Sequence, residues 1–163
     1  MIMRKPLKFL ALGMAFYVSS ALAQSSDTDP DWHESEVPAP PSFSIDHLIP
    51  IEMPHYVSLK FGVDPATLAI APDGIVRYVM VTQNTSGSVT AMYEGIRCAT
   101  GQVKTYARTS SGGAWSLVKD PQWHNLSDNL PSKHAIMLAR QGVCDGRGAA
   151  ASTVQDIIKA LKR

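Results

Sequence analysis

The residues best suited to ligand chemistry are tyrosines and arginines in three neighbouring stretches of the chain. They are Arg77, Tyr78, Tyr93, Arg97 and Tyr106. An arginine guanidinium binds a carboxylate or phosphate through parallel N–H groups, and a tyrosine offers both a ring and a hydroxyl. We therefore predict a binding surface for a small anionic or sugar-like ligand, or for a protein partner. The alternative is that these side chains only form cross-strand pairs on a solvated sheet face.

A second set of residues has the chemistry of general acids and bases. Glu94, Asp128 and His124 could serve a hydrolase in these roles. Such an enzyme needs a concave pocket that holds at least two of them. The sequence has no G-x-S-x-G motif, and its serines cluster in turns, where they satisfy backbone groups. The sequence therefore ranks catalysis below binding.

The remaining residue patterns predict no metal, no other cofactor and no nucleic-acid partner. None of the five histidines stands in an H-x-H or H-x-x-x-H pattern. If the two cysteines are paired, no soft ligand remains for zinc. From residue 60 onward twelve basic residues meet seven acidic ones without forming a basic cluster, so the charge pattern does not favour nucleic-acid binding.

Strands are expected to position the tyrosines and arginines. The three clearest are Ile75–Thr82, Val89–Arg97 and Gln102–Arg108. Short polar turns join them, and strands joined in this way pair antiparallel. The first is apolar on both faces, which is typical of a central strand. Alternation places Tyr93, Gly95 and Arg97 on one face of their strand and Glu94 on the other.

The carboxyl-terminal third is predicted to be helical. Ser132–Gln141 has a helical pattern that stops at Gly142, and Ser152–Gln155 has the spacing of a capping box. After this box, apolar residues recur at intervals of three and four, so the second helix needs a surface to cover. We expect an α+β fold, in which an antiparallel β-meander of four to six strands packs against the C-terminal helices.

Cys98 and Cys144 are the only cysteines of the chain. In an oxidising compartment two thiols of a small domain usually pair. This bridge would close a loop of about 46 residues and, in the chain-entropy model, stabilise the fold by up to about 4 kcal/mol. A catalytic thiol or a redox pair remains the alternative, although redox cysteines are usually adjacent, as in C-x-x-C.

The amino terminus indicates export. Residues 1–23 contain a basic start, an apolar run and the small residues Ala21 and Ala23, in the order of a cleavable signal peptide. The apolar run is shorter than the roughly 20 residues needed to cross a membrane. We expect a chain that does not span the membrane after cleavage and that resides in the periplasm, with secretion as an alternative.

Residues 24–44 form an acidic, proline-rich leader, and residues 45–163 form the folded domain. Between residues 24 and 59 there are seven acidic residues and no lysine or arginine. The leader is expected to be disordered and extended in solvent, because so polar a segment buries little apolar surface. Folding back over a basic face of the domain is the alternative.

Several short runs carry a family resemblance. They are Asp73–Tyr78, Tyr93–Cys98 and Lys104–Ala107, and the second reads Y-E-G-I-R-C. The chain resembles the CNP1-like family of small exported betaproteobacterial proteins from about Ile45 onward. It departs from the aromatic–Cys–Pro pattern associated with that family at its second cysteine. The resemblance implies an exported envelope protein and supplies no catalytic residues.

These observations favour a non-enzymatic accessory or binding module of the cell envelope. Its partner would be an envelope protein or the small ligand described above. The alternative is a cell-envelope hydrolase using Glu94, Asp128 or His124. A structural role through an exposed sheet edge is the third possibility.

Overall fold

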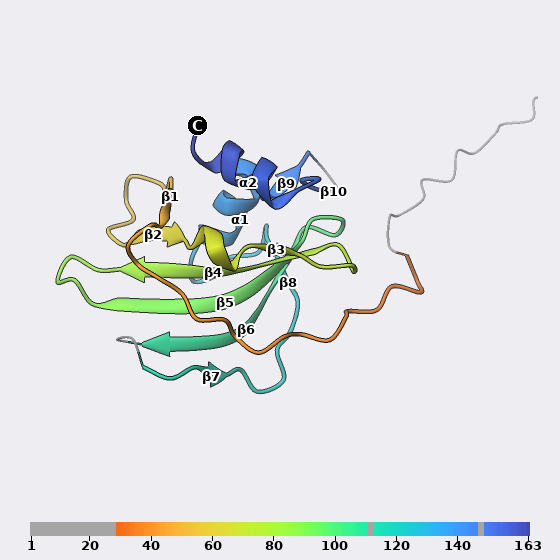
Figure 1. The fold of residues 1–163 in the computed structure, drawn as a ribbon, viewed down its shortest axis with the longest axis horizontal. Coiled ribbons are helices and arrows are strands. Elements are labelled where there is room, and N and C mark those ends of the chain that lie inside the picture. The colour runs from red at the N-terminus through yellow and green to blue at the C-terminus, as the bar shows by residue number, and fades with distance from the viewer. Residues whose placement is uncertain (1–28, 111–112, 147–148) are drawn as a thin grey trace, which may run out of the picture.

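The computed structural model describes residues 29–110, 113–146 and 149–163. The predicted signal peptide lies outside this range. Figure 1 shows a strongly twisted sheet with the helices gathered on one side. The strands are β1 Ile49–Ile51, β2 Lys60–Val63, β3 Ala69–Ile70, β4 Ile75–Gln83, β5 Val89–Arg97, β6 Gln102–Ser110, β7 Ser116–Leu117, β8 His124–Asn125, β9 Cys144–Asp145 and β10 Ala149–Ala150. The helices are the 3₁₀ turn η1 Pro65–Thr67, α1 His134–Leu138, the π-helical turn η2 Ala139–Val143 and α2 Val154–Leu161.

The main sheet is an antiparallel meander, as predicted. Its path runs β1-β2-β4-β5-β6-β7, with β3 added beside β4 and β8 beside β6. The three central strands β4, β5 and β6 are nine residues long each. Arg77 lies opposite Gly95, and Tyr78 lies opposite Glu94. These registers fix which side chains share a face.

The helices cover one face of the sheet and form the larger core with it. Tyr78, Met80 and Ile96 from the central strands pack against Leu138 of α1 and Ile157 of α2. All five side chains are fully buried. Burying this much apolar surface is the main force that holds the helices on the sheet. The α+β fold predicted from the sequence is confirmed.

Helix α2 begins one residue later than the sequence spacing indicates. The predicted capping box starts at Ser152, but Thr153 is the N-cap, and its hydroxyl accepts the N–H of Asp156 at 3.1 Å. Ile157 of this helix is fully buried in the core.

The predicted disulfide between Cys98 and Cys144 is present, with Cα atoms 5.6 Å apart. It joins the residue after β5 to β9, which follows the π-helical turn η2. The bridge therefore ties the middle of the sheet to the helical layer. None of the described cysteines is free.

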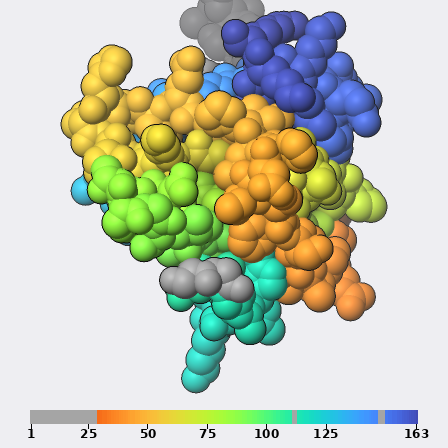
Figure 2. Space-filling view, turned by 60° about the vertical axis from the view of Figure 1, so that its left-hand side comes forward, coloured from red at the N-terminus to blue at the C-terminus, as the bar shows by residue number. Residues whose placement is uncertain are grey.

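Residues 29–44, called the N-terminal segment below, lie along the face of the sheet that the helices leave open. In Figure 1 this orange segment crosses the central strands on the side away from α1 and α2, and Figure 2 shows it against the green and teal atoms of those strands. Val37 and Phe43 pack on a second core that includes Val79, Val81 and Tyr93. The docked arrangement differs from the expected solvent-extended leader and corresponds to the alternative of folding back. The physical reason is that β4 is apolar on both faces and requires a second cover.

Candidate functional site

The five residues predicted to bind a ligand fall on both faces of the sheet. Arg77, Tyr93, Arg97 and Tyr106 lie on the face beneath the N-terminal segment, whereas Tyr78 faces the helices. Arg97 is half-buried and the other four are buried. The structure therefore brings together four of the five, under protein rather than on an open surface.

Two cations beneath the N-terminal segment are paired with carboxylates, one of which belongs to the segment itself. Lys104 Nζ lies 2.6 Å from Glu34 Oε2, and the Tyr106 hydroxyl donates to Glu34 Oε1 at 2.7 Å. Arg77 donates to Asp73 Oδ2 at 3.0 Å. Burial and the adjacent Glu34 carboxylate both raise the pKa of Tyr106, so its hydroxyl stays protonated as a donor. Glu34 was not predicted as a site residue, because it lies in a segment that the sequence analysis expected to be disordered. Its acidic side chain was the only available signal.

Gly95 allows close packing on this same face. A β-carbon at this position would lie 2.6 Å from the Tyr106 hydroxyl and 2.7 Å from Ile75 Cγ2. Both distances are shorter than van der Waals contact. The glycine therefore lets Tyr106 cross the middle of the sheet, which is the close approach that a strand glycine often marks.

The opposite face carries a buried polar network centred on Glu94. Its carboxylate accepts hydrogen bonds from Tyr78 Oη at 3.0 Å, Thr105 Oγ1 at 2.9 Å and His134 Nε2 at 2.7 Å. Glu94 is only 2% exposed. Three strands or helices, β4, β6 and α1, thus each send one donor to a side chain of β5. This arrangement satisfies the rule that a buried charge must be paired and hydrogen-bonded.

The network holds Glu94 in its ionised form. Burial alone would raise its pKa, but the charge of His134 and the hydrogen bonds from His134, Thr105 and Tyr78 outweigh burial and lower the pKa below its usual value. Burial, followed by the nearby Glu94 carboxylate, raises the pKa of Tyr78 well above its usual value. The site therefore contains a fixed negative charge and a tyrosine that stays neutral.

His134 links this network to a serine. Its Nδ1 lies 2.9 Å from Ser132 Oγ, a hydrogen bond in which the ring donates when the imidazole is charged and accepts when it is neutral with its proton on Nε2. The imidazole also stacks on Phe61, with ring centroids 5.5 Å apart. The result is a continuous Ser132–His134–Glu94 chain of hydrogen bonds. No local sequence pattern indicates the Glu94–His134 contact, because these two residues are 40 positions apart.

A cavity of about 390 Å³ opens onto this chain of hydrogen bonds. Its lining residues come from β5, β6, the loops around β8 and the start of α1. They are Met92, Glu94, Val103, Thr105, Arg108, Val118, Gln122, His124, Leu130, Pro131, Ser132, His134 and Ala135. Two of the three predicted acid–base residues, Glu94 and His124, therefore line one concave site. Asp128 is not among the lining residues, and its carboxylate instead accepts the backbone N–H of Asn125 at 3.0 Å.

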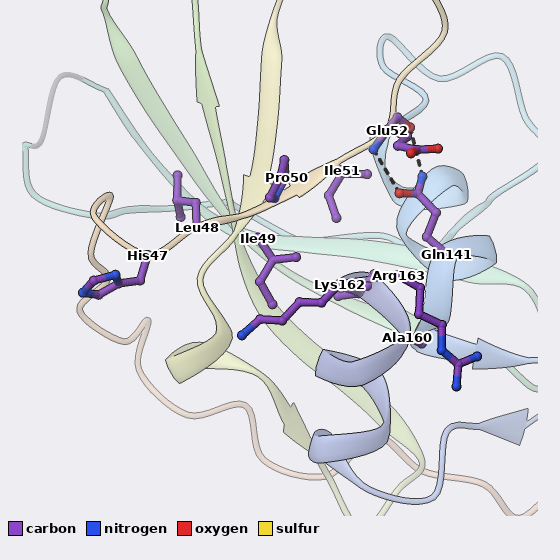
Figure 3. A pocket seen from close by; sticks show the side chains of 11 residues that line it. His47, Leu48, Ile49, Pro50, Ile51, Glu52, Gln141, Ala160, Lys162 and Arg163 are labelled. Atoms are coloured by element: carbon purple, nitrogen blue, oxygen red, sulfur yellow. Dashed lines mark hydrogen bonds between the residues drawn. The ribbon is translucent and has the colours of Figure 1, made fainter.

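A larger depression of about 790 Å³ lies between β1 and the end of α2 (Figure 3). Gln141 there forms two hydrogen bonds with the backbone of Glu52, each 2.9 Å long. Lys162 and Arg163 lie at its margin, and its buried lining residues, Ile49 and Ile51, are apolar. Because no buried titratable group faces it, we take the Glu94 cavity as the candidate site.

Nowhere in residues 29–110, 113–146 and 149–163 do three or more histidine, cysteine, aspartate or glutamate side chains come together in a metal-binding group. Within these same ranges, none of the helices has the length and hydrophobicity required to span a membrane.

The fold and the cavity together define a small disulfide-linked α+β protein with a buried carboxylate facing a preformed cavity. The chain belongs to the CNP1-like family, whose model matches residues 27–162. This match includes the N-terminal segment as well as the sheet and the helices. No curated protein and no solved structure matches the chain significantly.

Proposed function

We propose that this protein is an exported, non-enzymatic binding module of the cell envelope, and that it holds a small sugar-like ligand in the Glu94 cavity. The proposed periplasmic location rests on the predicted signal peptide at residues 1–23. The Cys98–Cys144 bridge is compatible with an oxidising compartment. Under this proposal the cleaved chain starts with residues 24–44, and the domain of residues 45–163 carries the binding site.

The observation that carries the binding proposal is the fixed Glu94 carboxylate at the cavity wall. It is buried, ionised and held by three donors from three different elements. A preorganised acceptor of this kind costs little to order when a ligand arrives. The cavity volume of about 390 Å³ also falls in the range of roughly 300–1,000 Å³ that is usual for small-molecule sites.

The lining of the cavity indicates the chemistry of the ligand. Thr105 and Ser132 supply hydroxyls beside the carboxylate, and the exposed side chains of Gln122 and His124 supply polar groups at the rim. Met92, Val118 and Leu130 are apolar walls. A hydroxylated ring presents polar edges and apolar faces, which match these two kinds of surface. The negative charge of Glu94 disfavours a fully anionic ligand at this position.

The test is ligand-observed NMR with the full chain against a panel of neutral and amino sugars. Gln122→Ala combined with His124→Ala removes rim groups that are exposed, so the fold is retained. We expect this variant to weaken binding at least five-fold. Arg140→Ala, which changes an exposed arginine outside the cavity, is the matched control and leaves binding unchanged. The absence of binding to any panel member, or equal binding by the rim variant, would refute the proposal.

A second candidate function is hydrolysis of an ester or amide, and the Ser132–His134–Glu94 chain favours it. In this mechanism Ser132 Oγ attacks the substrate carbonyl carbon while its proton passes to His134 Nδ1. The imidazole then returns the proton to the leaving group as the carbon–leaving-group bond breaks. Water then attacks the acyl carbon while His134 accepts its proton, and this proton passes to Ser132 Oγ as the acyl carbon–oxygen bond breaks. The ionised Glu94 orients the ring throughout.

Hydrolysis ranks second because Ser132 has a structural use. Its oxygen also accepts the backbone N–H of His134 at 3.4 Å, at the start of α1. A fluorophosphonate probe distinguishes the two functions, because it labels only an activated serine. Hydrolysis predicts a covalent adduct on Ser132 that Ser132→Ala abolishes. An unlabelled protein that still binds sugars would leave binding as the function.

A further inference from the structure

Trp32, Glu34 and Ser35 of the N-terminal segment each make specific hydrogen bonds with the domain. The Trp32 indole N–H donates to the carbonyl of Asp73 at 2.9 Å. Ser35 donates to the Asp73 carboxylate twice, from its backbone N–H at 2.8 Å and from its hydroxyl at 2.6 Å. Between them, Glu34 binds Lys104 and Tyr106. The sheet face thus holds residues 32–35 as a bound peptide would be held.

The groups that receive Glu34 form a built carboxylate site. The side chains of Lys104 and Arg77 are only 12% and 4% exposed. Arg77 already has the Asp73 carboxylate, so Lys104, beside the Tyr106 hydroxyl, is the buried cation that needs a further anion. Tyr106 remains a donor because its pKa is raised by burial. An acidic side chain is therefore the chemistry that this position requires.

Arg77 contacts the segment through Ser35 but keeps one donor that the segment does not use. Nη2 donates to the carbonyl and hydroxyl oxygens of Ser35, each at 3.4 Å. Its Nη2 lies 4.0 Å from Glu34 Oε1, which is beyond hydrogen-bonding distance. Its buried Nε has no hydrogen-bond partner among the described residues. A buried donor without a partner costs about 1–3 kcal/mol. The docked segment therefore leaves one buried donor of Arg77 unsatisfied.

A second subsite recognises an aromatic ring. The Arg97 guanidinium lies 3.5 Å from the centre of the Trp32 ring. Trp123 packs edge-on against the same ring, with the two ring centroids 6.3 Å apart. Lys104 lies 4.8 Å from the centre of the Trp123 ring, so the aromatic and carboxylate subsites share a wall. Their spacing matches an aromatic residue two positions before an acidic one.

We propose that this face is a peptide-recognition site for an extended segment of a partner protein, in which an aromatic residue stands two positions before an acidic one. Residues 32–35 are the intramolecular occupant. The described part of the segment, residues 29–44, contains no strand, so its release breaks no sheet ladder. The site lies on the opposite face from the Glu94 cavity and is independent of the sugar-binding proposal.

The test uses a fluorescent peptide with the sequence of residues 31–37 and measures its anisotropy with the full chain. An intramolecular occupant competes at an effective concentration of roughly millimolar. We expect the Glu34→Ala protein to bind the peptide at least ten-fold more tightly than the unchanged protein. Adding Lys104→Met to Glu34→Ala, or Glu34→Gln to the peptide, should reduce affinity at least ten-fold.

A second measurement keeps the proposal falsifiable if Glu34→Ala does not fold. In the unchanged protein, excess peptide should displace the segment and accelerate hydrogen exchange of the Ser35 amide at least three-fold. The Glu34→Gln peptide should have no such effect. Unchanged Ser35 exchange at saturating peptide, or peptide binding insensitive to Lys104→Met, would overturn the proposal. A concentration-dependent dimer that excludes the peptide would overturn it too, since the site would then serve a second copy of the chain.

Discussion

His134 Nε2 lies 2.7 Å from Glu94 Oε2, and this buried contact joins the first helix to the centre of the sheet. Both side chains are almost fully enclosed, at 9% and 3% exposure. The contact does two things at once. It fixes the helix over the sheet, and it fixes the charge that faces the cavity.

Replacing Glu94 by glutamine should weaken the fold and flatten its response to acid. Because the pKa of Glu94 is lower in the folded protein than its ordinary value of 4.5, its contribution is fully present above that value. It is lost as the pH falls through the folded pKa. We expect Glu94→Gln to cost about 3 kcal/mol at pH 7, because it breaks a buried charged network. Urea unfolding at pH 7, 5, 4 and 3 measures both effects.

The control for this series is Glu36→Gln, which changes an exposed carboxylate of the N-terminal segment. It should leave the unfolding free energy within about 0.5 kcal/mol of the original. If Glu94→Gln were as stable as this control at pH 7, the network would not stabilise the fold. An equally steep loss of stability below pH 4.5 in both variants would assign the acid response to other groups.

Removing the disulfide should destabilise the protein without changing its topology. The bridge closes a loop with a sequence separation of 46, and Cys98→Ala with Cys144→Ala should lower the unfolding free energy by about 2–4 kcal/mol. A reducing agent should lower the melting temperature of the original protein and leave that of the double variant unchanged. A double variant as stable as the oxidised protein would show that the helical layer needs no bridge.

The parts of the fold that follow from local patterns were predictable from the sequence. β5 has its predicted bounds, Val89–Arg97, because polar turns flank a strongly β-forming run. In the stretch Tyr56–Phe61, the alternation of Val57, Leu59 and Phe61 also predicts a strand with these three residues on one face. Strand β2 instead begins at Lys60, and Tyr56 is 82% exposed. Leu59 is 42% exposed, so the predicted alternation is wrong, and pairing with β4 sets the position of β2, since Phe61 lies opposite Thr82. Such long-range register is not encoded in a short apolar pattern.

The candidate site was only partly predictable, because its partners meet through the tertiary fold. Alternation correctly separated Glu94 from Tyr93 and Arg97. It did not indicate that the face of Tyr93 is covered by the N-terminal segment. One signal was present, since β4 is apolar on both faces and the helices supply only one cover. The Glu94–His134 contact had no local signal, as it joins residues 40 positions apart.

Gly95→Ala should destabilise the sheet through overpacking. The added methyl group would meet the Tyr106 hydroxyl and Ile75 Cγ2 at less than 3 Å, so one of them must move. We expect a loss of about 2 kcal/mol in urea unfolding. In the Tyr106→Phe background the same change should cost less, because the nearest atom is gone. Equal costs in the two backgrounds would show that Tyr106 does not limit the space at Gly95.

Phe43→Ala should loosen the N-terminal segment from the sheet. Phe43 packs edge-on against Trp115, with the two ring centroids 5.7 Å apart, and belongs to the second core with Val81 and Tyr93. The ring is partly exposed, so we expect a loss of about 2 kcal/mol, below the usual cost of a fully buried phenylalanine. Protease cleavage within residues 29–44 should also become faster, because a segment released from the sheet can enter the active site of the protease. Ile45→Ala is the matched control, because Ile45 is 54% exposed. It should change neither the unfolding free energy nor the cleavage rate. If both variants were cleaved at the original rate, Phe43 would not be what holds the segment in place.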